Sequence, residues 1–421
     1  MKKFLTIIFL FTILATSNIF ANGTSESATK KEESKTDLLL WLPPFASNSN
    51  SGLLDDEFWN QRLQPWADAN NVNLEIEITP WSGYEEKYLT AFASGDAPDV
   101  GYMYLQMIYD FINMGTLEDI DKYFSAEDKE DYLYYDKGYM MGAQYSLPFV
   151  VGNARVMYAN QDILDQAGIT ELPETWDEFI AACLQIKQNV PDVMPFAQAW
   201  ANPTIDLVDD NFFPYFWQAG GEIYNEDGTR LTLTDTSAAY DTANFLYDLK
   251  NKYHITDDTQ LGITSVVTEF KKGNVGFAYM GTFKSDLISD AGVNWTFIPS
   301  LKRDKKAIWV ASDSLIMNSA SEHKELAASL MKYMTTTETM SKYHSDICAF
   351  SPITKTEKYN DDPAFEEMYT NDTQYFKTLP VAKSSAAVFD NLSKNLQLMM
   401  MDEITPEEAI DRTVDFAENV L

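Results

Sequence analysis

One short stretch, AFASGDAPDVGYM at residues 91–103, limits the fold most strongly because it joins a helix to a strand. Apolar side chains recur at helical spacing over residues 84–92, which predicts one buried helix face. Gly95 can take a positive φ and end that helix, and Pro98 cannot continue it. Residues 99–104 then have the apolar pattern of a short strand. The stretch therefore predicts the helix-to-strand unit of an α/β sheet.

Two apolar runs precede this joint and extend the pattern. LLLW at residues 38–41 is followed by two prolines and predicts a buried first strand. NLEIEITPW at residues 73–81 alternates in polarity and predicts a second strand. Two successive β-α-β units predict a parallel sheet whose loops gather at the carboxyl ends of its strands. At 421 residues the chain is long enough for two domains.

Two capping boxes predict where later helices begin. Thr175 and Glu178 have the spacing of a capping box, so a helix is expected to start at Trp176. Thr405 and Glu408 repeat this spacing, with a proline at the first helical position.

The N-terminus has the pattern of a secretory signal peptide. Residues 1–21 combine two lysines, an apolar run and then small residues, so we expect them to be removed on export. The alternative is an uncleaved membrane anchor, although the apolar run at residues 4–15 is short for crossing a bilayer. Residues 22–36 are polar and charged, which predicts a disordered leader. The mature protein is expected to be soluble and periplasmic.

Charge and cysteine content narrow the function classes. The formal net charge of −33 argues against binding to nucleic acid or to an anionic membrane surface. Cys183 lies in an apolar helical pattern and is expected to be a buried free thiol, and with Cys348 as the second cysteine no disulfide framework is indicated. Three widely spaced histidines make no zinc motif, and no cofactor or metal is indicated.

Four motifs in order resemble the sugar-binding group of extracellular solute-binding proteins of ABC importers, the group that includes maltose-binding protein. The resemblance covers residues 37–421. The motifs are AFASGDAPDVGYM, then LPFVVGNARVMYANQDIL with PETWDEF, then FKKGNVGFAYMGTF, and finally LIMNSASEHKELAASLMKYM. Each motif is weak alone, whereas four in sequence behind a signal peptide form a specific signal.

This resemblance implies an α/β, two-lobe periplasmic-binding-protein fold of type II, with the ligand held in the cleft between the lobes. Each lobe would be a mixed sheet flanked by helices, and three hinge crossings would join the lobes near residues 148–152, 308–313 and 346–350. Lobe one would then comprise residues 37–149 and 311–347. Lobe two would comprise residues 150–309 and 349–421.

Candidate ligand contacts follow from the same resemblance and from aromatic content. Sugars present apolar C–H faces and rings of hydroxyls, so a site needs flat aromatic platforms and fixed hydrogen-bond partners. The chain has 9 Trp, 23 Tyr and 25 Phe, although an aromatic side chain is more often part of a core than of a platform. Carboxylates at a hinge strand are awkward to bury without a partner, and Arg155 has the alternative role of an ion pair. The predicted ligand-binding residues are Phe45, Trp81, Tyr104, Gln106, Asn153, Arg155, Trp200, Asp210, Asn211, Phe283, Asp313, Ser314 and Phe389.

Departures from maltose-binding protein indicate a different specificity. Positions that carry acidic contacts there are Gln106 or Asn153 here, and two stacking tryptophans are replaced by Phe283 and Phe389. We therefore expect aromatic platforms without a preference for maltose, and a weaker response to the preferred sugar in Phe283→Ala.

The leading hypothesis is a monomeric, non-enzymatic protein that captures a sugar or oligosaccharide and delivers it to the permease of an ABC importer. A charged solute such as a polyamine or glycerol phosphate is the alternative ligand. A polyamine would suit Asp210 and Asp313 beside aromatic rings. The chain lacks the short motifs of serine hydrolases, zinc proteases and nucleotide-binding enzymes. A secreted glycosidase is the third possibility, because glycosidases need only a carboxylate pair and have no such short motif.

Overall fold

A computed structural model describes the chain in eight segments, residues 34–46, 52–201, 206–225, 228–256, 262–348, 350–358, 363–380 and 382–421. Thr36–Leu421 forms one compact unit, and it carries all the elements below. The predicted signal peptide, residues 1–21, and nearly all of the predicted leader, residues 22–36, lie outside the described residues. Thr36 itself belongs to a strand, because its N–H donates to the carbonyl oxygen of Asn71 at 3.0 Å. The expected leader therefore ends at least one residue too late.

The first sheet confirms the parallel β-α-β units predicted from the N-terminal half. Its five strands lie in the order β2-β1-β3-β12-β6. Pairing is parallel among the first three strands, whereas β12 is antiparallel to both β3 and β6. We call this sheet with its helices lobe one. The strands are β1 (Thr36–Leu42), β2 (Val72–Ile78), β3 (Val100–Met103), β6 (Ser146–Gly152) and β12 (Ala311–Met317).

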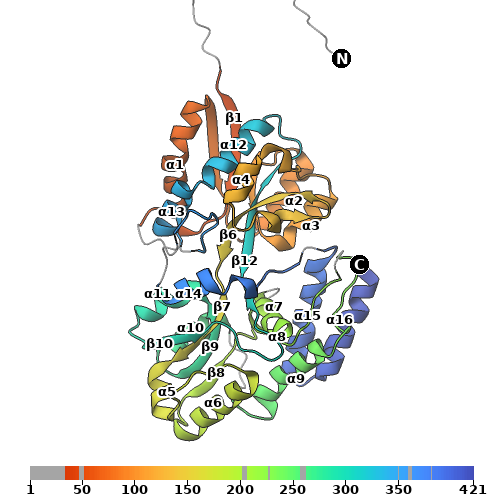
Figure 1. Cartoon of the computed structure of the whole chain (residues 1–421). Helices are drawn as coiled ribbons and strands as arrows, with labels where there is room; N and C mark the ends of the chain where they lie inside the picture. The colour runs from red at the N-terminus through yellow and green to blue at the C-terminus, as the bar shows by residue number, and fades with distance from the viewer. Residues whose placement is uncertain are drawn as a thin grey trace, which may run out of the picture. The chain divides into compact units, whose positions relative to one another are not determined.

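Helices α1 and α13 lie beside this sheet on the left of the view and α2 and α3 on the right, and α12 packs against α1 (Figure 1). Gly95 has φ +87° and ends α2 as expected. Gly101 on β3 lies so close to α2 that a Cβ there would sit 2.6 Å from the Tyr88 hydroxyl oxygen. The remaining elements of lobe one are α1 (Asp55–Ala69), α2 (Tyr84–Ser94), α3 (Leu105–Asn113), α4 (Ala126–Asp131), β4 (Tyr139–Met140), β5 (Ala143–Gln144), α12 (Lys324–Met334), α13 (Thr337–Asp346) and the 3-10 turns Asp121–Tyr123 and Tyr135–Gly138.

The second sheet has four strands in the order β10-β7-β9-β8, and with its helices we call it lobe two. Here β7 is antiparallel to both β9 and β10, and β8 is parallel to β9, so this sheet is also mixed. The strands are β7 (Arg155–Asn160), β8 (Met194–Ala197), β9 (Val275–Gly281) and β10 (Trp295–Ile298), with a separate parallel pair formed by β11 (Ile308–Trp309) and β13 (Phe376–Lys377).

Helices surround the second sheet, and Figure 1 shows α15 and α16 packed side by side next to α9. Both predicted capping boxes are present, so α6 begins at Trp176 and α16 at Pro406. Cys183 on α6 is a buried free thiol, as expected. The helices are α5 (Gln161–Ala167), α6 (Trp176–Asn189), α7 (Asp206–Asn211), α8 (Phe213–Gln218), α9 (Ala238–Asn251), α10 (Ile263–Lys271), α11 (Ser285–Ser289), α14 (Glu366–Asn371), α15 (Ser385–Met400) and α16 (Pro406–Val420), with 3-10 turns at Thr282–Lys284, Pro363–Phe365 and Thr373–Tyr375.

Strand pairing moves one expected lobe boundary. Residues 150–152 were expected in lobe two, but Val150, Val151 and Gly152 pair with β12 in the first sheet. The chain then enters the second sheet at Arg155, the first residue of β7. We therefore place the first connection at residues 153–154, because sheet pairing and not the apolar run decides where a strand belongs.

A second boundary moves further. Residues 349–421 were expected in lobe two, yet Phe350 and Ile353 lie in the core of lobe one. The Ile353 carbonyl oxygen accepts from the Leu133 N–H at 2.9 Å, which ties this segment to lobe one. Phe365 belongs to a core of lobe two. The third connection therefore comes after Ile353, later than residues 346–350, where it was expected.

Candidate functional site

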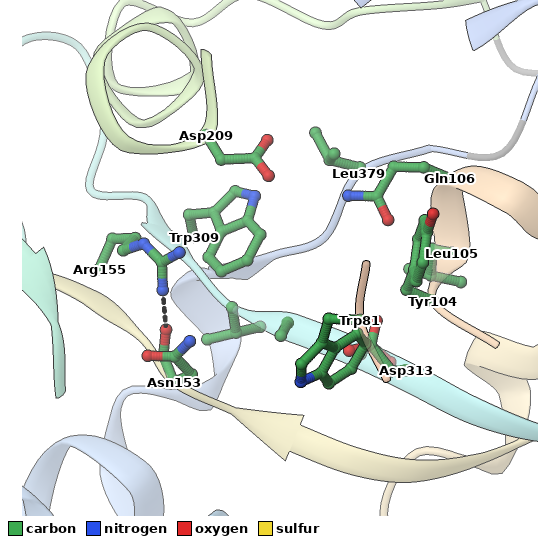
Figure 2. Close-up of a pocket in the computed structure, with 13 residues that line it drawn as sticks. Trp81, Tyr104, Leu105, Gln106, Asn153, Arg155, Asp209, Trp309, Asp313 and Leu379 are labelled. Carbon is green, nitrogen blue, oxygen red and sulfur yellow. Dashed lines mark hydrogen bonds between the residues drawn. The ribbon is translucent and has the colours of Figure 1, made fainter. Parts of the chain in front are cut away.

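A cavity of about 440 Å³ lies where side chains of the two lobes and their connections meet. Figure 2 shows the thirteen residues that line it. They follow the carboxyl ends of β2 and β3, surround the connections β6–β7 and β11–β12, and include α7 and the segment after β13. The lining residues are Trp81, Tyr104, Leu105, Gln106, Asn153, Arg155, Asp209, Trp309, Val310, Ala311, Ser312, Asp313 and Leu379.

Trp81 forms the exposed aromatic face of the lobe-one wall. It is 44% exposed and lies in the loop between β2 and α2. Its indole N–H donates to the Pro44 carbonyl oxygen at 3.2 Å. Tyr104, which immediately follows β3, adds a half-buried ring whose hydroxyl donates to Glu85 at 3.3 Å. The loops after parallel strands thus bring both rings to one edge of the sheet.

Asp313, the third residue of β12, supplies the half-buried carboxylate of the same wall. Its carboxylate accepts from the Tyr102 hydroxyl and from the Leu105 N–H. Burial raises the pKa of Asp313 to about 6, although these two hydrogen bonds act in the opposite direction. The carboxyl group can therefore accept hydrogen bonds from a ligand at neutral pH, and it gains a proton in mild acid.

Arg155 organises the lobe-two wall. Its guanidinium pairs with the Asp210 carboxylate on α7, and the two side chains are 12% and 7% exposed. A second donor reaches the Asn153 carbonyl oxygen at 3.0 Å. The guanidinium carbon also lies 4.6 Å from the ring centroid of Trp309, a cation–π contact that covers one face of the indole. One arginine thus joins β7, α7 and β11 around the cavity.

Trp309 and Asp209 form the inner part of this wall. Trp309 is 6% exposed, and its indole nitrogen points toward the Asp209 carboxylate (Figure 2). Within the described segments that indole N–H has no hydrogen-bond acceptor. Asn153 has φ +46°, a conformation that asparagine tolerates better than most residues, and its buried side-chain oxygen likewise lacks a described donor. A ligand hydroxyl or a water molecule can satisfy such groups, which makes this wall suited to polar ligands.

The structure brings part of the predicted site together. The predicted residues that line the cavity are Trp81, Tyr104, Gln106, Asn153, Arg155 and Asp313. The predicted residues outside the lining are Phe45, Trp200, Asp210, Asn211, Phe283, Ser314 and Phe389. Asp210 still contributes indirectly, because it pairs with Arg155.

Three of the predicted contacts are core residues of lobe two. Trp200 is 4% exposed and donates to Gln198, and Phe389 packs edge-on against Phe213 with ring centroids 5.0 Å apart. Asn211 is 1% exposed and donates to the Ala199 carbonyl oxygen at 3.1 Å. Each of the three side chains thus has a partner within lobe two, and a ligand contact at any of them stays a prediction.

The other predicted residues outside the lining have different surroundings. Ser314 faces the interior of the first sheet and is 1% exposed, because strand alternation points it away from the side of Asp313. Phe283 is 41% exposed and is not among the lining residues, and the Lys284 ammonium lies 3.9 Å from its ring centroid. Burial, followed by the nearby Arg155, lowers the pKa of Lys284. Phe45 lies directly behind Trp81, with ring centroids 5.5 Å apart.

Several lining residues were missed by sequence reasoning. Trp309 lies within the predicted second crossing, so an aromatic residue in that crossing was the signal that could have identified it. Asp209 precedes the predicted Asp210, and the choice between them depends on which helix face points inward. Leu379 and the small residues of the hinge strand carry no distinguishing sequence signal.

Two structural features are absent from the described segments. Across these segments, no group of three or more His, Cys, Asp or Glu side chains is arranged to hold a metal ion. The helices formed by the described residues are all too short or too polar to cross a bilayer.

Two relatives match most of the chain. A binding protein of Brucella abortus is 26% identical over 351 residues, which cover 79% of this chain and 82% of that protein. An arabinooligosaccharide-binding protein of Halalkalibacterium halodurans is 25% identical over 432 aligned positions, which cover 92% of this chain and 90% of that protein.

A solved structure supports the fold. The ABC substrate-binding protein of Listeria monocytogenes in complex with cycloalternan superposes with a TM-score of 0.75 at 19% identity, covering 91% of this chain and 98% of that chain. At this identity the likeness concerns the fold, which is that of two-lobe type II periplasmic binding proteins. The family model described as bacterial extracellular solute-binding protein matches residues 49–341. The chain therefore belongs to the bacterial extracellular solute-binding proteins.

Proposed function

We propose that this protein captures a sugar or short oligosaccharide in the cavity between its lobes and delivers it to the permease of an ABC importer. The observation that carries this proposal is the set of side chains that line the cavity. Aromatic rings of Trp81, Tyr104 and Trp309 line it together with two carboxylates and two amides. Aromatic faces pack against the C–H groups of a sugar ring, and carboxylates accept from its hydroxyls.

The division of the lining between the lobes supports capture by closure. Trp81 and Gln106 belong to lobe one, whereas Arg155 and Asp209 belong to lobe two. A ligand that touches both walls gains contacts only when the lobes approach, so it stabilises the closed arrangement. The closed form is then the species that the permease recognises.

Relatives support the ligand class. The Halalkalibacterium relative is named for arabinooligosaccharides, and the Listeria structure holds cycloalternan. In the same proposal the protein acts as a monomer in the periplasm or at the cell exterior, after cleavage of its signal peptide. It binds its ligand without converting it.

A thermal-shift panel tests the ligand class directly. Purified protein is heated with maltotriose, arabinotriose, N,N′-diacetylchitobiose, spermidine or glycerol 3-phosphate, each at a millimolar concentration. A sugar in large excess over its Kd is expected to add about 3–4 kcal/mol to the free energy of unfolding and to raise Tm. Trp81→Ala should lose most of this shift, and Phe92→Leu, which changes a ring away from the cavity, should keep it.

A polyamine is the second candidate, because Asp209 and Asp313 line the same cavity as three aromatic rings. A shift with spermidine and none with sugars would replace the sugar assignment. Turnover is checked separately by analysing the sugar after long incubation with the protein. Products that disappear in Asp313→Asn would contradict a binding role.

A further inference from the structure

Phe45 lies at the centre of an aromatic cluster behind the cavity wall. Its ring centroid is 5.5 Å from that of Trp81, at an interplanar angle of 80°. It is also 5.5 Å from the Tyr102 ring and 5.7 Å from the Phe350 ring, both in edge-on geometry. Edge-on pairs hold rings at defined angles because the positive ring edge meets the negative ring face. Phe45 therefore touches three rings at once without lining the cavity.

The backbone around Phe45 is held by a buried carboxylate. Asp55, in the first turn of α1, is 5% exposed. Its two carboxylate oxygens accept from the N–H groups of Phe45 at 3.0 Å and Ala46 at 2.8 Å. Hydrogen bonds to an ionised acceptor are the stronger kind, and a helix N-terminus favours the negative charge. The start of the β1–α1 loop is thus clamped to the helix.

Trp81 is attached to this clamped segment at two points. Its ring packs on Phe45, and its indole N–H donates to the carbonyl oxygen of Pro44, the preceding residue. The Trp81 ring also packs against Tyr84, with ring centroids 5.4 Å apart, and lies edge-on to Tyr102 at 6.0 Å, while the residue stays 44% exposed. Residues 44–46 therefore supply one ring contact and the indole hydrogen bond that orient this platform.

The same phenylalanine contacts the groups next to the lobe connections. Tyr102, one of its ring partners, donates its hydroxyl to Asp313 in the cavity wall. Phe350, another partner, lies beside Gly152, where an added Cβ would be 3.5 Å from the Phe350 ring. The next residue, Ser351, donates its N–H to the Val151 carbonyl oxygen at 2.8 Å. Phe45 therefore connects the exposed platform with the start of the first connection.

We propose that Phe45, clamped by Asp55, is a positioning residue that sets the orientation of Trp81 and thereby the affinity for ligand. It does so from behind the wall and makes no ligand contact of its own. The affinity part rests on the proposed function, whereas the orientation of Trp81 is a property of the ligand-free protein.

The first test needs no ligand. The near-UV circular dichroism band of Trp81 is defined as the difference between wild type and Trp81→Phe. Phe45→Leu keeps an apolar side chain but removes the ring, and it should lose that band. Phe45→Tyr restores a ring edge and should regain it. Phe92→Leu is the matched control in the same lobe. The Phe92 ring does not line the cavity and contacts Phe111, with ring centroids 5.1 Å apart, so this variant should leave the band intact.

The clamp is tested by Asp55→Asn. An amide offers one acceptor oxygen in place of two, so one of the N–H groups of Phe45 and Ala46 loses its acceptor. We expect a partial loss of the Trp81 band. Asp56→Asn, on the neighbouring exposed residue, should have no effect.

The second test is a double-mutant cycle on ligand affinity. The probe is whichever of maltotriose and arabinotriose gives the larger thermal shift. Phe45→Leu should weaken binding about three- to tenfold, the range expected for one edge-on aromatic pair. In the Trp81→Ala background the same substitution should cause no further loss, because it acts through that ring. Phe45→Tyr should bind as wild type does.

Three outcomes would overturn the proposal. An unchanged Trp81 band in Phe45→Leu would show that the ring is held by other groups. Equal losses of affinity in the wild-type and Trp81→Ala backgrounds would make Phe45 a direct ligand contact. An equal loss of the band in Phe92→Leu would reduce the effect to general loosening of the lobe. Absence of binding by every sugar would refute the proposed function and leave the spectroscopic result standing.

Discussion

The two walls of the cavity differ in how their aromatic and charged groups are held. On lobe one, Trp81 is 44% exposed and rests on a clamped loop. On lobe two, Trp309 is 6% exposed, and one of its faces is covered by Arg155, which is itself paired with Asp210. One wall thus presents a ring that still faces water, and the other presents a ring built into a charged cluster.

This difference separates two ways of preparing a binding site. A buried wall loses little conformational freedom when a ligand arrives, because its side chains are ordered beforehand. An exposed ring gains burial on closure, so it contributes affinity that depends on ligand and on lobe position. We therefore expect substitutions in the lobe-two wall to change mainly the stability of the protein. Substitutions in the lobe-one wall should change mainly ligand binding.

Arg155→Met gives the largest expected effect and tests whether the lobe-two wall is a structural unit. Removal of the guanidinium leaves Asp210 buried without its partner, which should lower the free energy of unfolding by about 3–5 kcal/mol. Denaturant unfolding measures this change. Arg230→Met, which breaks an exposed pair with Asp235, is the control and should leave the unfolding midpoint nearly unchanged. Similar midpoints for both variants would mean that Arg155 is not structurally important.

Asp313→Asn tests the charge on the lobe-one wall. Burial raises the pKa of Asp313 to about 6, above its ordinary value of 3.8, so the ionised form is disfavoured in the folded protein. Stability from this group is present below pH 4 and is lost as pH rises through 6. The asparagine variant cannot ionise, and it should raise the free energy of unfolding by about 2–3 kcal/mol at pH 7.5.

The same variant should differ little from wild type at pH 4, where Asp313 is mostly protonated. Denaturant unfolding at the two pH values checks the sign, with exposed Asp56→Asn as a control. Equal stabilisation at both pH values would show that ionisation is not the cause.

Trp81→Ala is expected to separate binding from folding. Loss of a central aromatic contact should weaken sugar binding by about 2 kcal/mol, or roughly thirtyfold. Because this ring is largely exposed in the absence of ligand, the unfolding midpoint should change little. Isothermal calorimetry and denaturant unfolding on the same preparation provide both values. A large loss of stability with unchanged sugar affinity would show that the lobe-one wall serves stability and not binding, contrary to this expectation.

Phe283→Ala is expected to have the smallest effect. From sequence, this residue was expected to carry a stacking platform, but it lies outside the cavity lining. We now expect less than a twofold change in sugar affinity, within the range of ordinary surface substitutions. A loss of the ligand-induced thermal shift would extend the binding surface beyond the cavity toward Lys284.

Local features of the fold could be predicted from sequence because neighbouring residues decide them. Gly95 ends its helix with a positive φ, and the capping box at Thr175 and Glu178 starts the next one at the predicted residue. The strand after the Gly-Asp-Ala-Pro-Asp joint is shorter than expected, Val100–Met103. Asp99 instead uses its carboxylate to accept from the Leu39 N–H, and Tyr104 precedes the first turn of α3.

The candidate site could be predicted only where it follows such local signals. Trp81, Tyr104 and Asp313 lie just beyond strand ends or on a predicted crossing, and all three line the cavity. Phe389 was chosen by analogy of position along the chain and Trp200 as a further aromatic platform, and both are core residues. Trp309 also lies on a predicted crossing, but the sequence does not show that Arg155 packs on its ring.

The amino-acid sequence by itself determined the order of helices and strands, the parallel start of the first sheet and the family of the fold. These depend on hydrophobic periodicity, glycine and proline positions and helix caps, all of which act over a few residues. Only the tertiary structure decided which rings face the cavity and where each lobe ends. Exposure and ion pairing are set by partners distant in sequence, as Arg155 and Asp210 are, and no local pattern specifies them.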